Sequence, residues 1–582
     1  MGFDAMKYIF MQFLCRLTPG TMLAERPLSS PCAPPHELLE DELEEDDTMA
    51  FKTQEMIDRG RLPPSYFENP VVRASAADSP PIPLALYQDG VQYSKSDTVV
   101  GFWLINLVTG SRSMITMVRK SILCQCGCRG WDTMWPILAS IRWSLESCAR
   151  GEYPRADFLG RDFAGGSNAA ALAGQPLRSK AIVLQLKGDW AEFCERFGYP
   201  SPKSVGRPCF CCNAHSNDRY SPAPISLVEQ PWVTNTEDSF RRATELCEIR
   251  CCLRSIDFDV LVNLMQYDKR AYGKHGLVLQ RDYAPLNLLK GDRLEPSYNL
   301  PDVNDFFGLH LFPTQELTFW RVSRATLVWH RCPLWCPEIG LTATDTIAID
   351  LLHTYYLGPL QVWVKLGFWS LIDSGIWGSH CAAAEERQAI AIAAIGFDLL
   401  QWYASYDRLH PGKPITRLHK LTSTKLGGGR ESRNFKYKAM ETWGAALFLL
   451  DYMEPRSARL GEVGRKVLEA GPFLVGFMLR LQKCGPVISV AEAQDLMDRW
   501  KNWMACAEEL SAYTPKAHLM YHLILRSLRM GNPVNYSAFT DESLNRTLRD
   551  CLRLCHQRNF ELLGMLKVTA LLKRPVIRRR LR

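Results

Sequence analysis

Three acidic residues stand next to regular segments of the chain, where several carboxylates can converge. Asp89 follows the apolar run in LALYQDG, Asp189 follows the one in AIVLQLKGD, and Glu542 lies at the start of a helical segment in FTDESLN. Mg²⁺ and Mn²⁺ are hard cations that prefer oxygen ligands, and a pair of such ions can stabilise both the attacking and the leaving oxygen of phosphodiester cleavage. Asp89, Asp189 and Glu542 are therefore candidates for a catalytic site that binds two divalent ions.

Each of these acids also has an ordinary structural explanation. A strand-end Asp is more often a turn residue, and a helical Glu is usually a solvated surface group. Asp541 is adjacent to Glu542 and is an alternative third acid. Because successive residues of a helix point in different directions, only one of the two can face a common site, and we prefer Glu542.

A second set of residues has the types and spacing of zinc ligands. Cys209 and Cys212 form a C-x-x-C pair after Asp189, and His518 and His522 lie four residues apart before Glu542. Histidines at positions i and i+4 share one face of a helix, and two thiolates with two imidazoles complete a tetrahedral Zn²⁺ site. A buried thiol cluster would give the same cysteine pattern, so the histidines are what favour structural zinc. Such a site would join the region after Asp189 to the helix before Glu542.

The segments around these residues predict a mixed sheet. LALYQ, TVVGFWLINLV and RSMITMVRK are short apolar or alternating runs that predict a three-stranded meander. WDTMWPILASIRWSLESCARG has helical spacing and ends at a Gly, and AIVLQLKGD is typical of a buried strand. With Asp89 ending the first strand and Asp189 the fourth, this order is that of a ribonuclease-H-like fold. AAAEERQAIAIAAIGFDLLQWYASYDRL and ETWGAALFLLDYM then predict helices.

We therefore expect an α/β chain whose ribonuclease-H-like mixed sheet is interrupted by a long all-α insertion. The acidic run HELLEDELEEDD repels itself and predicts disorder. The expected domains are a disordered acidic leader (1–80), the first part of the core (81–230), the α-helical insertion (231–510), the last part of the core with the His pair and the catalytic helix (511–570), and a basic tail (571–582).

Composition limits the class of protein. The chain has 582 residues, of which 47% are hydrophobic, and a formal net charge of +7, which permits a polyanionic partner without requiring one. Its 20 cysteines without a convincing signal peptide are typical of reduced thiols and metal ligands, and no apolar run is long enough to span a bilayer. We expect a soluble intracellular protein. The role of three further cysteines stays open: Cys124, Cys126 and Cys128.

The combined order of these motifs resembles the DDE transposases of the CACTA/Plavaka (En/Spm-like) type. The resemblance covers about residues 80 to 570 and includes a D-x-x-H motif, Asp350 and His353, in the insertion. The related catalytic core of the V(D)J recombinase has the same order of C-x-x-C, paired His and Glu. The resemblance implies a catalytic triad of Asp89, Asp189 and Glu542 with two Mg²⁺ or Mn²⁺ ions, and structural Zn²⁺ on the Cys and His pairs.

The resemblance further implies DNA strand cleavage and strand transfer in the nucleus. The partners would be transposon ends, target DNA and at least one second copy of the chain. Lys516, Arg546 and Arg549 flank the site residues and are candidate phosphate contacts, with a solvated helix face as the alternative. A full transposase would carry a DNA-binding domain where this chain has its acidic leader. The alternative function is therefore a non-catalytic, domesticated, zinc-stabilised DNA-binding or scaffold protein derived from a transposase.

Overall fold

The structure of the protein is a computed structural model. It describes residues 9–15, 26–123, 130–197, 199, 202, 209–214, 225–238, 332–429 and 435–572. The chain folds into two compact units. The first comprises Met1–Ser216, Thr234–Ala348 and Phe539–Arg582, and the second comprises Asn217–Val233 and Ile349–Ala538.

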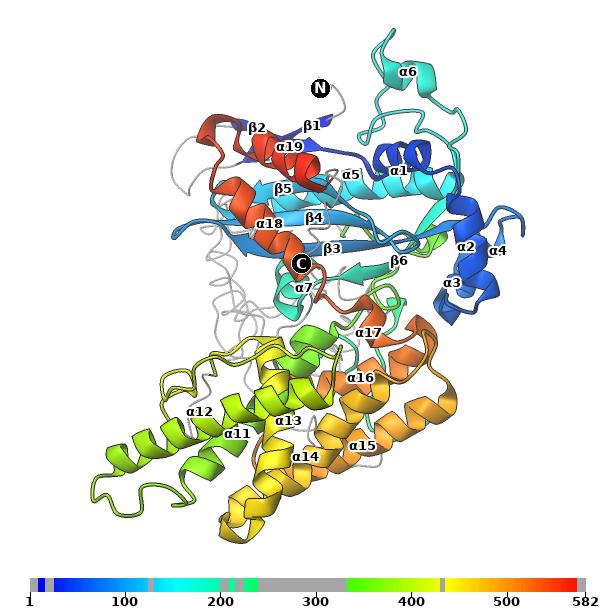
Figure 1. Ribbon diagram of the computed structural model, residues 1–582. Coiled ribbons are helices and arrows are strands. Elements are labelled where there is room, and N and C mark those ends of the chain that lie inside the picture. The colour runs from blue at the N-terminus through cyan, green and yellow to red at the C-terminus, as the bar shows by residue number, and fades with distance from the viewer. Residues whose placement is uncertain are drawn as a thin grey trace, which may run out of the picture. The chain divides into compact units, whose positions relative to one another are not determined.

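A mixed sheet forms the centre of the first unit (Figure 1). The predicted meander is confirmed as β3 (Ile82–Gln92), β4 (Thr98–Asn106) and β5 (Arg112–Arg119), which pair antiparallel. The fourth predicted strand, β6 (Ala181–Lys187), pairs parallel with β3. Beyond β5 the sheet continues with β2 (Arg26–Cys32) and β1 (Ile9–Cys15), in the order β1-β2-β5-β4-β3-β6.

Helices cover both faces of this sheet. The predicted helix is confirmed as α5 (Trp131–Arg150), which ends at Gly151 with a left-handed backbone (φ 75°). Its Leu138 and Ile141 line a small apolar pocket together with Leu86 of β3. On the other face, α18 (Glu542–Leu552) packs on β3 and α19 (Phe560–Leu572) packs on β5 (Figure 1). Strand β3 thus presents alternate side chains to α5 and to α18.

The acidic segment is helical, so the prediction of disorder over residues 1–80 was wrong there. Helix α1 (Pro35–Glu45) contains most of the acidic run and buries Leu39 and Leu43 on one face. His36 Nδ1 lies 2.7 Å from the Ser144 hydroxyl of α5. Leucines at i and i+4 give the helix an apolar stripe, and the acids occupy the solvated face. Three shorter helices follow: α2 (Met49–Asp58), α3 (Pro64–Glu68) and α4 (Pro70–Arg73).

The second unit is helical and has a core rich in tryptophan. Trp363, Trp369, Trp500 and Trp503 are at most 2% exposed, and the indole of Trp363 donates a hydrogen bond to the Val467 carbonyl at 2.8 Å. The two helices predicted between residues 381 and 453 are confirmed as α12 and α13. The longer helices are α11 (Pro359–Ile372), α12 (Ala384–Leu409), α13 (Ala439–Met453), α14 (Glu462–Leu481), α15 (Val490–Glu509) and α16 (Pro515–Met530).

Some sequence predictions fall outside the described residues. These are Cys124, Cys126 and Cys128, the part of the predicted insertion between residues 239 and 331, and the basic tail from residue 573. None of the helices that the structure describes is both long enough and apolar enough to cross a membrane.

Candidate functional site

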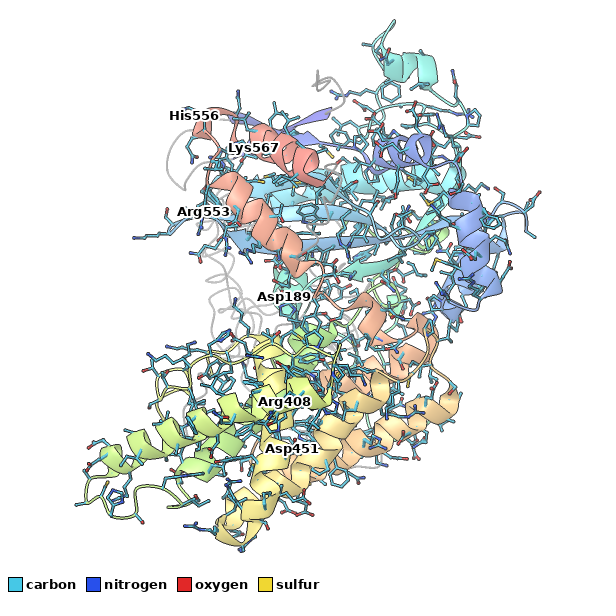
Figure 2. All side chains as sticks on the ribbon, viewed as in Figure 1. Asp189, Arg408, Asp451, Arg553, His556 and Lys567 are labelled. Atoms are coloured by element: carbon cyan, nitrogen blue, oxygen red, sulfur yellow. The ribbon has the colours of Figure 1, made fainter. Side chains whose placement is uncertain are left out.

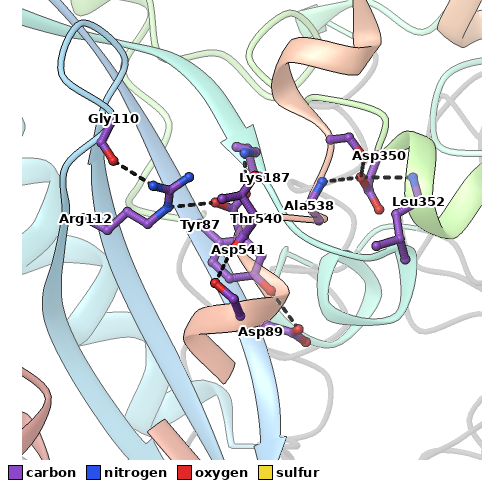
Figure 3. A network of polar contacts seen from close by, with 12 residues as sticks. Tyr87, Asp89, Gly110, Arg112, Lys187, Asp350, Leu352, Ala538, Thr540 and Asp541 are labelled. Atoms are coloured by element: carbon purple, nitrogen blue, oxygen red, sulfur yellow. Dashed lines mark hydrogen bonds and ion pairs between the residues drawn. The ribbon is translucent and has the colours of Figure 1, made fainter. Parts of the chain in front are cut away.

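Asp89 lies inside β3, three residues before the strand ends, and not at its end as the sequence predicted. Strand β4 extends the ladder past it, so that Asp89 pairs with Gly101. Its Oδ1 accepts a hydrogen bond from the Gly90 amide at 2.7 Å. Its Oδ2 accepts from the Tyr87 hydroxyl at 2.9 Å and from Asn545 Nδ2 of α18 at 2.5 Å. Asp89 is thus fixed on the sheet face that α18 covers (Figure 3).

Asp189 follows the end of β6 and lies beside Asp89 by strand register. Tyr87 of β3 pairs with Lys187 of β6, so two residues further along each parallel strand the chain reaches Asp89 and Asp189. Asp189 Oδ1 accepts a hydrogen bond from the Glu192 amide at 2.7 Å, at the start of α7 (Trp190–Phe197). Asp189 therefore caps a helix, which is the structural role expected of such a residue, and it also lies next to a second carboxylate.

The adjacent acids Asp541 and Glu542 have different surroundings. The Asp541 side chain is fully buried and forms ion pairs with Lys187 Nζ and, at 3.3 Å, with Arg112 Nε. Glu542 begins α18, and its charge acts on Asp89 and Tyr87. Asp541 is thus neutralised by two cations, and Glu542 is the acid that shares the surroundings of Asp89.

The acids of this cluster repel one another. The pKa of Asp89 is raised from 3.8 to about 7, first by burial and then by the charges of Glu542 and Asp189. Glu192 adds to the increase, and the hydrogen bond from Tyr87 opposes it. The charged form of Asp89 is therefore disfavoured by burial and by its acidic neighbours, whereas Glu192 is itself paired with Arg196 at 3.1 Å and with Lys120 at 3.8 Å. Carboxylate oxygens are the ligand type that Mg²⁺ and Mn²⁺ prefer. Among the described residues, however, the ligand atoms that lie within 4.8 Å of one another are those of the Cys/His group and not those of these acids.

Sequence reasoning did not identify Tyr87 and Asn545. Asn545 Nδ2 also donates to the Tyr87 hydroxyl at 2.9 Å, so one amide contacts both residues of β3. Burial, followed by the charges of Asp89 and Glu542, raises the pKa of Tyr87 well above its ordinary value, which keeps the phenol protonated as a donor. The available signal was the E-x-x-N spacing, because Asn545 lies one helical turn after Glu542 on the same face.

The predicted zinc ligands form a compact group. The ligand atoms of Cys209, Cys212, His518 and His522 all lie within 4.8 Å of one another, and all four residues are buried. The two imidazoles direct their Nε2 atoms toward each other at 3.1 Å. Two sulfurs and two imidazole nitrogens are a donor set that zinc prefers, and the group could hold such a metal ion.

The surroundings of these four side chains are compatible with metal binding. The Cys211 amide donates to Cys209 Sγ at 3.3 Å, and the Ala214 amide donates to Cys212 Sγ at 3.4 Å. Backbone hydrogen bonds of this kind orient the two sulfurs. Burial, followed by the charges of His518 and Arg526, lowers the pKa of His522 well below its ordinary value. His522 is therefore neutral, as a metal ligand must be.

The D-x-x-H motif joins the beginning of the second unit to its end. Asp350 is buried, and its Oδ2 lies 2.6 Å from His353 Nδ1. Its Oδ1 accepts a hydrogen bond from the Ala538 amide at 2.7 Å and lies 3.4 Å from the Ser537 hydroxyl (Figure 3). Burial raises the pKa of Asp350, but the hydrogen bonds and charge of His353 and the Ala538 amide bring it below its ordinary value.

Asp350→Ala is expected to destabilise the protein by about 3 kcal/mol, because it removes charge-assisted hydrogen bonds and leaves the buried Ala538 amide without its acceptor. Ser537→Ala removes only the contact at 3.4 Å and is expected to cost less than about 1 kcal/mol. Guanidinium unfolding of both variants measures the difference. Equal losses of stability in the two variants would show that Asp350 does not connect the beginning of the second unit to its end.

The three predicted phosphate contacts differ in their surroundings. Lys516 Nζ donates to the Leu357 carbonyl at 3.0 Å within the second unit. In the first unit, the Arg546 side chain is 80% exposed, and Arg546 and Arg549 lie 3.9 and 3.4 Å from Asp550.

Figure 2 shows three more basic side chains, those of Arg553, His556 and Lys567, around the turn between α18 and α19. Arg546, Arg549 and Arg553 share one face of α18, because they are spaced by three and four residues. Arg553 was not among the phosphate contacts predicted from the sequence.

Comparison with known proteins adds no relative. A scan of the chain against protein-family models found no match, and a search of curated proteins found none either.

Proposed function

We propose that the protein is a DDE-type enzyme that cleaves DNA strands and transfers them, like the CACTA/Plavaka transposases that its motifs resemble. The observation that carries this proposal is the acidic cluster, in which Glu542 and Asp189 both act on Asp89. The meander β3–β5, with β6 parallel beside β3, supports the ribonuclease-H-like assignment. The resemblance places such a protein in the nucleus.

Asp89, Asp189 and Glu542 would hold two Mg²⁺ or Mn²⁺ ions. When bound, such ions lower the pKa of water and stabilise negative charge on a phosphate. Tyr87 and Asn545 fix the orientation of the Asp89 carboxylate by hydrogen bonds, so that its oxygens need not reorganise. Asp189 is held by the first turn of α7, and Glu542 by α18.

The proposed reaction has two balanced steps. In the first, water attacks a phosphodiester, the bond from phosphorus to the 3′ oxygen breaks, and a 3′-hydroxyl and a 5′-phosphate result. In the second, that hydroxyl attacks a phosphodiester of the target, one P–O bond replaces another, and its proton passes to the displaced 3′ oxygen. Neither step needs an oxidant or an external energy source. Joining two ends needs two active sites, so we propose an oligomer of at least two chains.

The basic face of α18 is the proposed path of the DNA backbone. Arg546 and Arg549 extend along the helix away from Glu542, and Arg553 follows at its C-terminal end. Guanidinium groups bind phosphate bidentately and without base preference. The zinc group would stabilise the fold and take no part in the chemistry.

The test measures nicking and strand transfer on plasmid DNA with Mg²⁺ or Mn²⁺, for the wild-type protein, Asp189→Ala and Glu542→Ala. Wild type is expected to produce both nicked and joined DNA, and both variants are expected to produce neither. Asp162→Asn, at an exposed acid of the first unit away from α18, is the control and is expected to keep activity. A zinc-loaded wild-type protein that binds DNA but never cuts it would replace this proposal with the scaffold protein.

A further inference from the structure

We propose that the buried ion pair of Lys187 and Asp541 positions the carboxylates of the acidic cluster for metal binding. The inference rests on the proposed function, because it assumes that Asp89, Asp189 and Glu542 bind divalent ions. It assigns to Lys187, Asp541 and Arg112 a role that their sequence context does not indicate.

The two partners of the ion pair stand next to the candidate ligands. Lys187 is the last residue of β6, two residues before Asp189. Asp541 directly precedes Glu542 at the start of α18. The pair therefore connects the two chain segments that carry Asp189 and Glu542, although 354 positions separate its members in the sequence.

The ion pair is enclosed by protein. The Asp541 side chain is 0% exposed and the Lys187 side chain is 7% exposed. Arg112, at the start of β5, approaches Asp541 from the other side at 3.3 Å, and its own guanidinium donates to the Gly110 carbonyl at 2.7 Å (Figure 3). Asp541 is therefore held between β5 and β6.

A second contact fixes α18 one turn further on. Asn545 donates to Asp89 Oδ2 at 2.5 Å and to the Tyr87 hydroxyl at 2.9 Å. Glu542 lies between the two contacts. A helix held at residues 541 and 545 can neither rotate about its axis nor slide along the sheet, since either motion would break one of them. The carboxylate of Glu542 is thereby kept at a fixed place relative to Asp89.

Stability alone does not account for such a pair. Burying two charges removes them from water, and their mutual attraction roughly balances that loss. An apolar pair of similar volume often gives equal or greater stability, whereas removing one partner leaves an uncompensated buried charge. An ion pair does constrain geometry, because the ammonium must meet the carboxylate. Stability and metal affinity can therefore be separated by mutation.

The experiment compares Lys187→Met, Asp541→Leu and the double variant Lys187→Met/Asp541→Leu in the full-length, zinc-loaded protein. Thermal unfolding measures stability, and electron paramagnetic resonance of added Mn²⁺ measures metal affinity without any DNA. Both single variants are expected to lose stability, and the double variant is expected to recover it. The double variant is nevertheless expected to bind Mn²⁺ about 10-fold more weakly, as is typical for loss of groups that orient metal ligands.

The matched control is a second ion pair of the same unit. Arg119 Nε lies 2.6 Å from Glu561 Oε1, joining β5 to α19, with side chains 17% and 11% exposed. Arg119→Met/Glu561→Leu is expected to leave Mn²⁺ affinity unchanged. If the double variant at 187 and 541 does not fold, Arg112→Met is used instead, because it removes the partly exposed partner of Asp541. It is expected to weaken Mn²⁺ binding measurably, with little change in the unfolding temperature.

Several outcomes would overturn the inference. Wild-type affinity for Mn²⁺ in the double variant, or in Arg112→Met if only that variant folds, would leave the ion pair no positioning role. An equal loss of Mn²⁺ affinity in Arg119→Met/Glu561→Leu would mean that removing any ion pair between the sheet and its helices weakens metal binding. If the wild-type protein binds Mn²⁺ but never cleaves DNA, the proposed function fails while the Mn²⁺ comparison still decides this inference. A wild-type protein that binds no Mn²⁺ would overturn both.

Discussion

Asp89→Asn is expected to make the Mg²⁺-free protein more stable at pH 8 while reducing DNA cleavage by more than about 100-fold. Loss of outer-shell partners alone typically costs 10- to 100-fold, and Asp89 is proposed to touch the ion itself. The gain in stability follows from removing a charge that is buried and repelled by Glu542 and Asp189, since asparagine has the shape of aspartate without its charge. It is reduced because one of the two acceptor oxygens becomes an NH₂ group that faces a donor. We expect the gain to be about 2 kcal/mol, part of the energy equivalent to the shift in the Asp89 pKa.

The pH dependence of this effect has a definite sign. The pKa of Asp89 in the folded protein is raised to about 7 from an ordinary value of 3.8. The folded protein therefore holds this proton more tightly than the unfolded chain does, and the Mg²⁺-free protein loses stability as the pH rises from about 4 to about 7. Asp89→Asn removes this dependence, so the advantage of the variant should be present at pH 8 and absent near pH 4.

Thermal unfolding of the zinc-loaded protein, with and without added Mg²⁺, measures the change in stability, and nicking of plasmid DNA measures the loss of cleavage. Mg²⁺ should stabilise the wild-type protein and have little effect on Asp89→Asn. Asp97→Asn is the control of opposite sign, because Asp97 accepts hydrogen bonds from the hydroxyls of Ser121 and Tyr93, at 2.6 and 2.9 Å. That variant should be less stable than wild type. A destabilised Mg²⁺-free Asp89→Asn would contradict the picture of carboxylates that repel one another.

The elements of the sheet could be predicted because their signals are local. Short apolar runs within residues 82–119 and over 181–187 reflect the burial of each strand on both faces, and Gly151 marks the end of α5. The acidic segment was misjudged for a related reason. The prediction considered the charge of the whole run, whereas the few buried residues His36, Leu39 and Leu43 are enough to give α1 a buried face.

The contacts that set the acidic cluster are not local, and the sequence could not reveal them. Types and spacing identified Asp89, Asp189 and Glu542 as candidates and favoured Glu542 over Asp541, but they could not show what Asp541 contacts instead. Those contacts are with Lys187 and Arg112, which lie hundreds of residues away in the chain. A lysine at the end of a strand has no pattern that predicts a buried aspartate as its partner.

Removal of zinc is expected to have the largest effect on stability. The protein should bind about one zinc ion per chain, and chelation or Cys209→Ser should lower its unfolding temperature by about 10 °C or more. The reason is that structural zinc supplies folding energy directly, amounting to about 10–16 kcal/mol in small zinc-finger peptides. A chain with two large cores should lose a smaller share of its total stability than such peptides do.

Cys211→Ser separates a metal site from a cluster of buried thiols. Cys211 lies between Cys209 and Cys212 and is as fully buried, but its sulfur does not belong to the group of four ligand atoms. If zinc holds the group together, Cys211→Ser should keep its zinc and lose only about 1–2 kcal/mol, whereas Cys209→Ser should lose both zinc and stability. Zinc released on unfolding can be counted with a chromogenic chelator. Equal losses in the two variants, with no zinc released from wild type, would mean that burial alone packs these cysteines and histidines together.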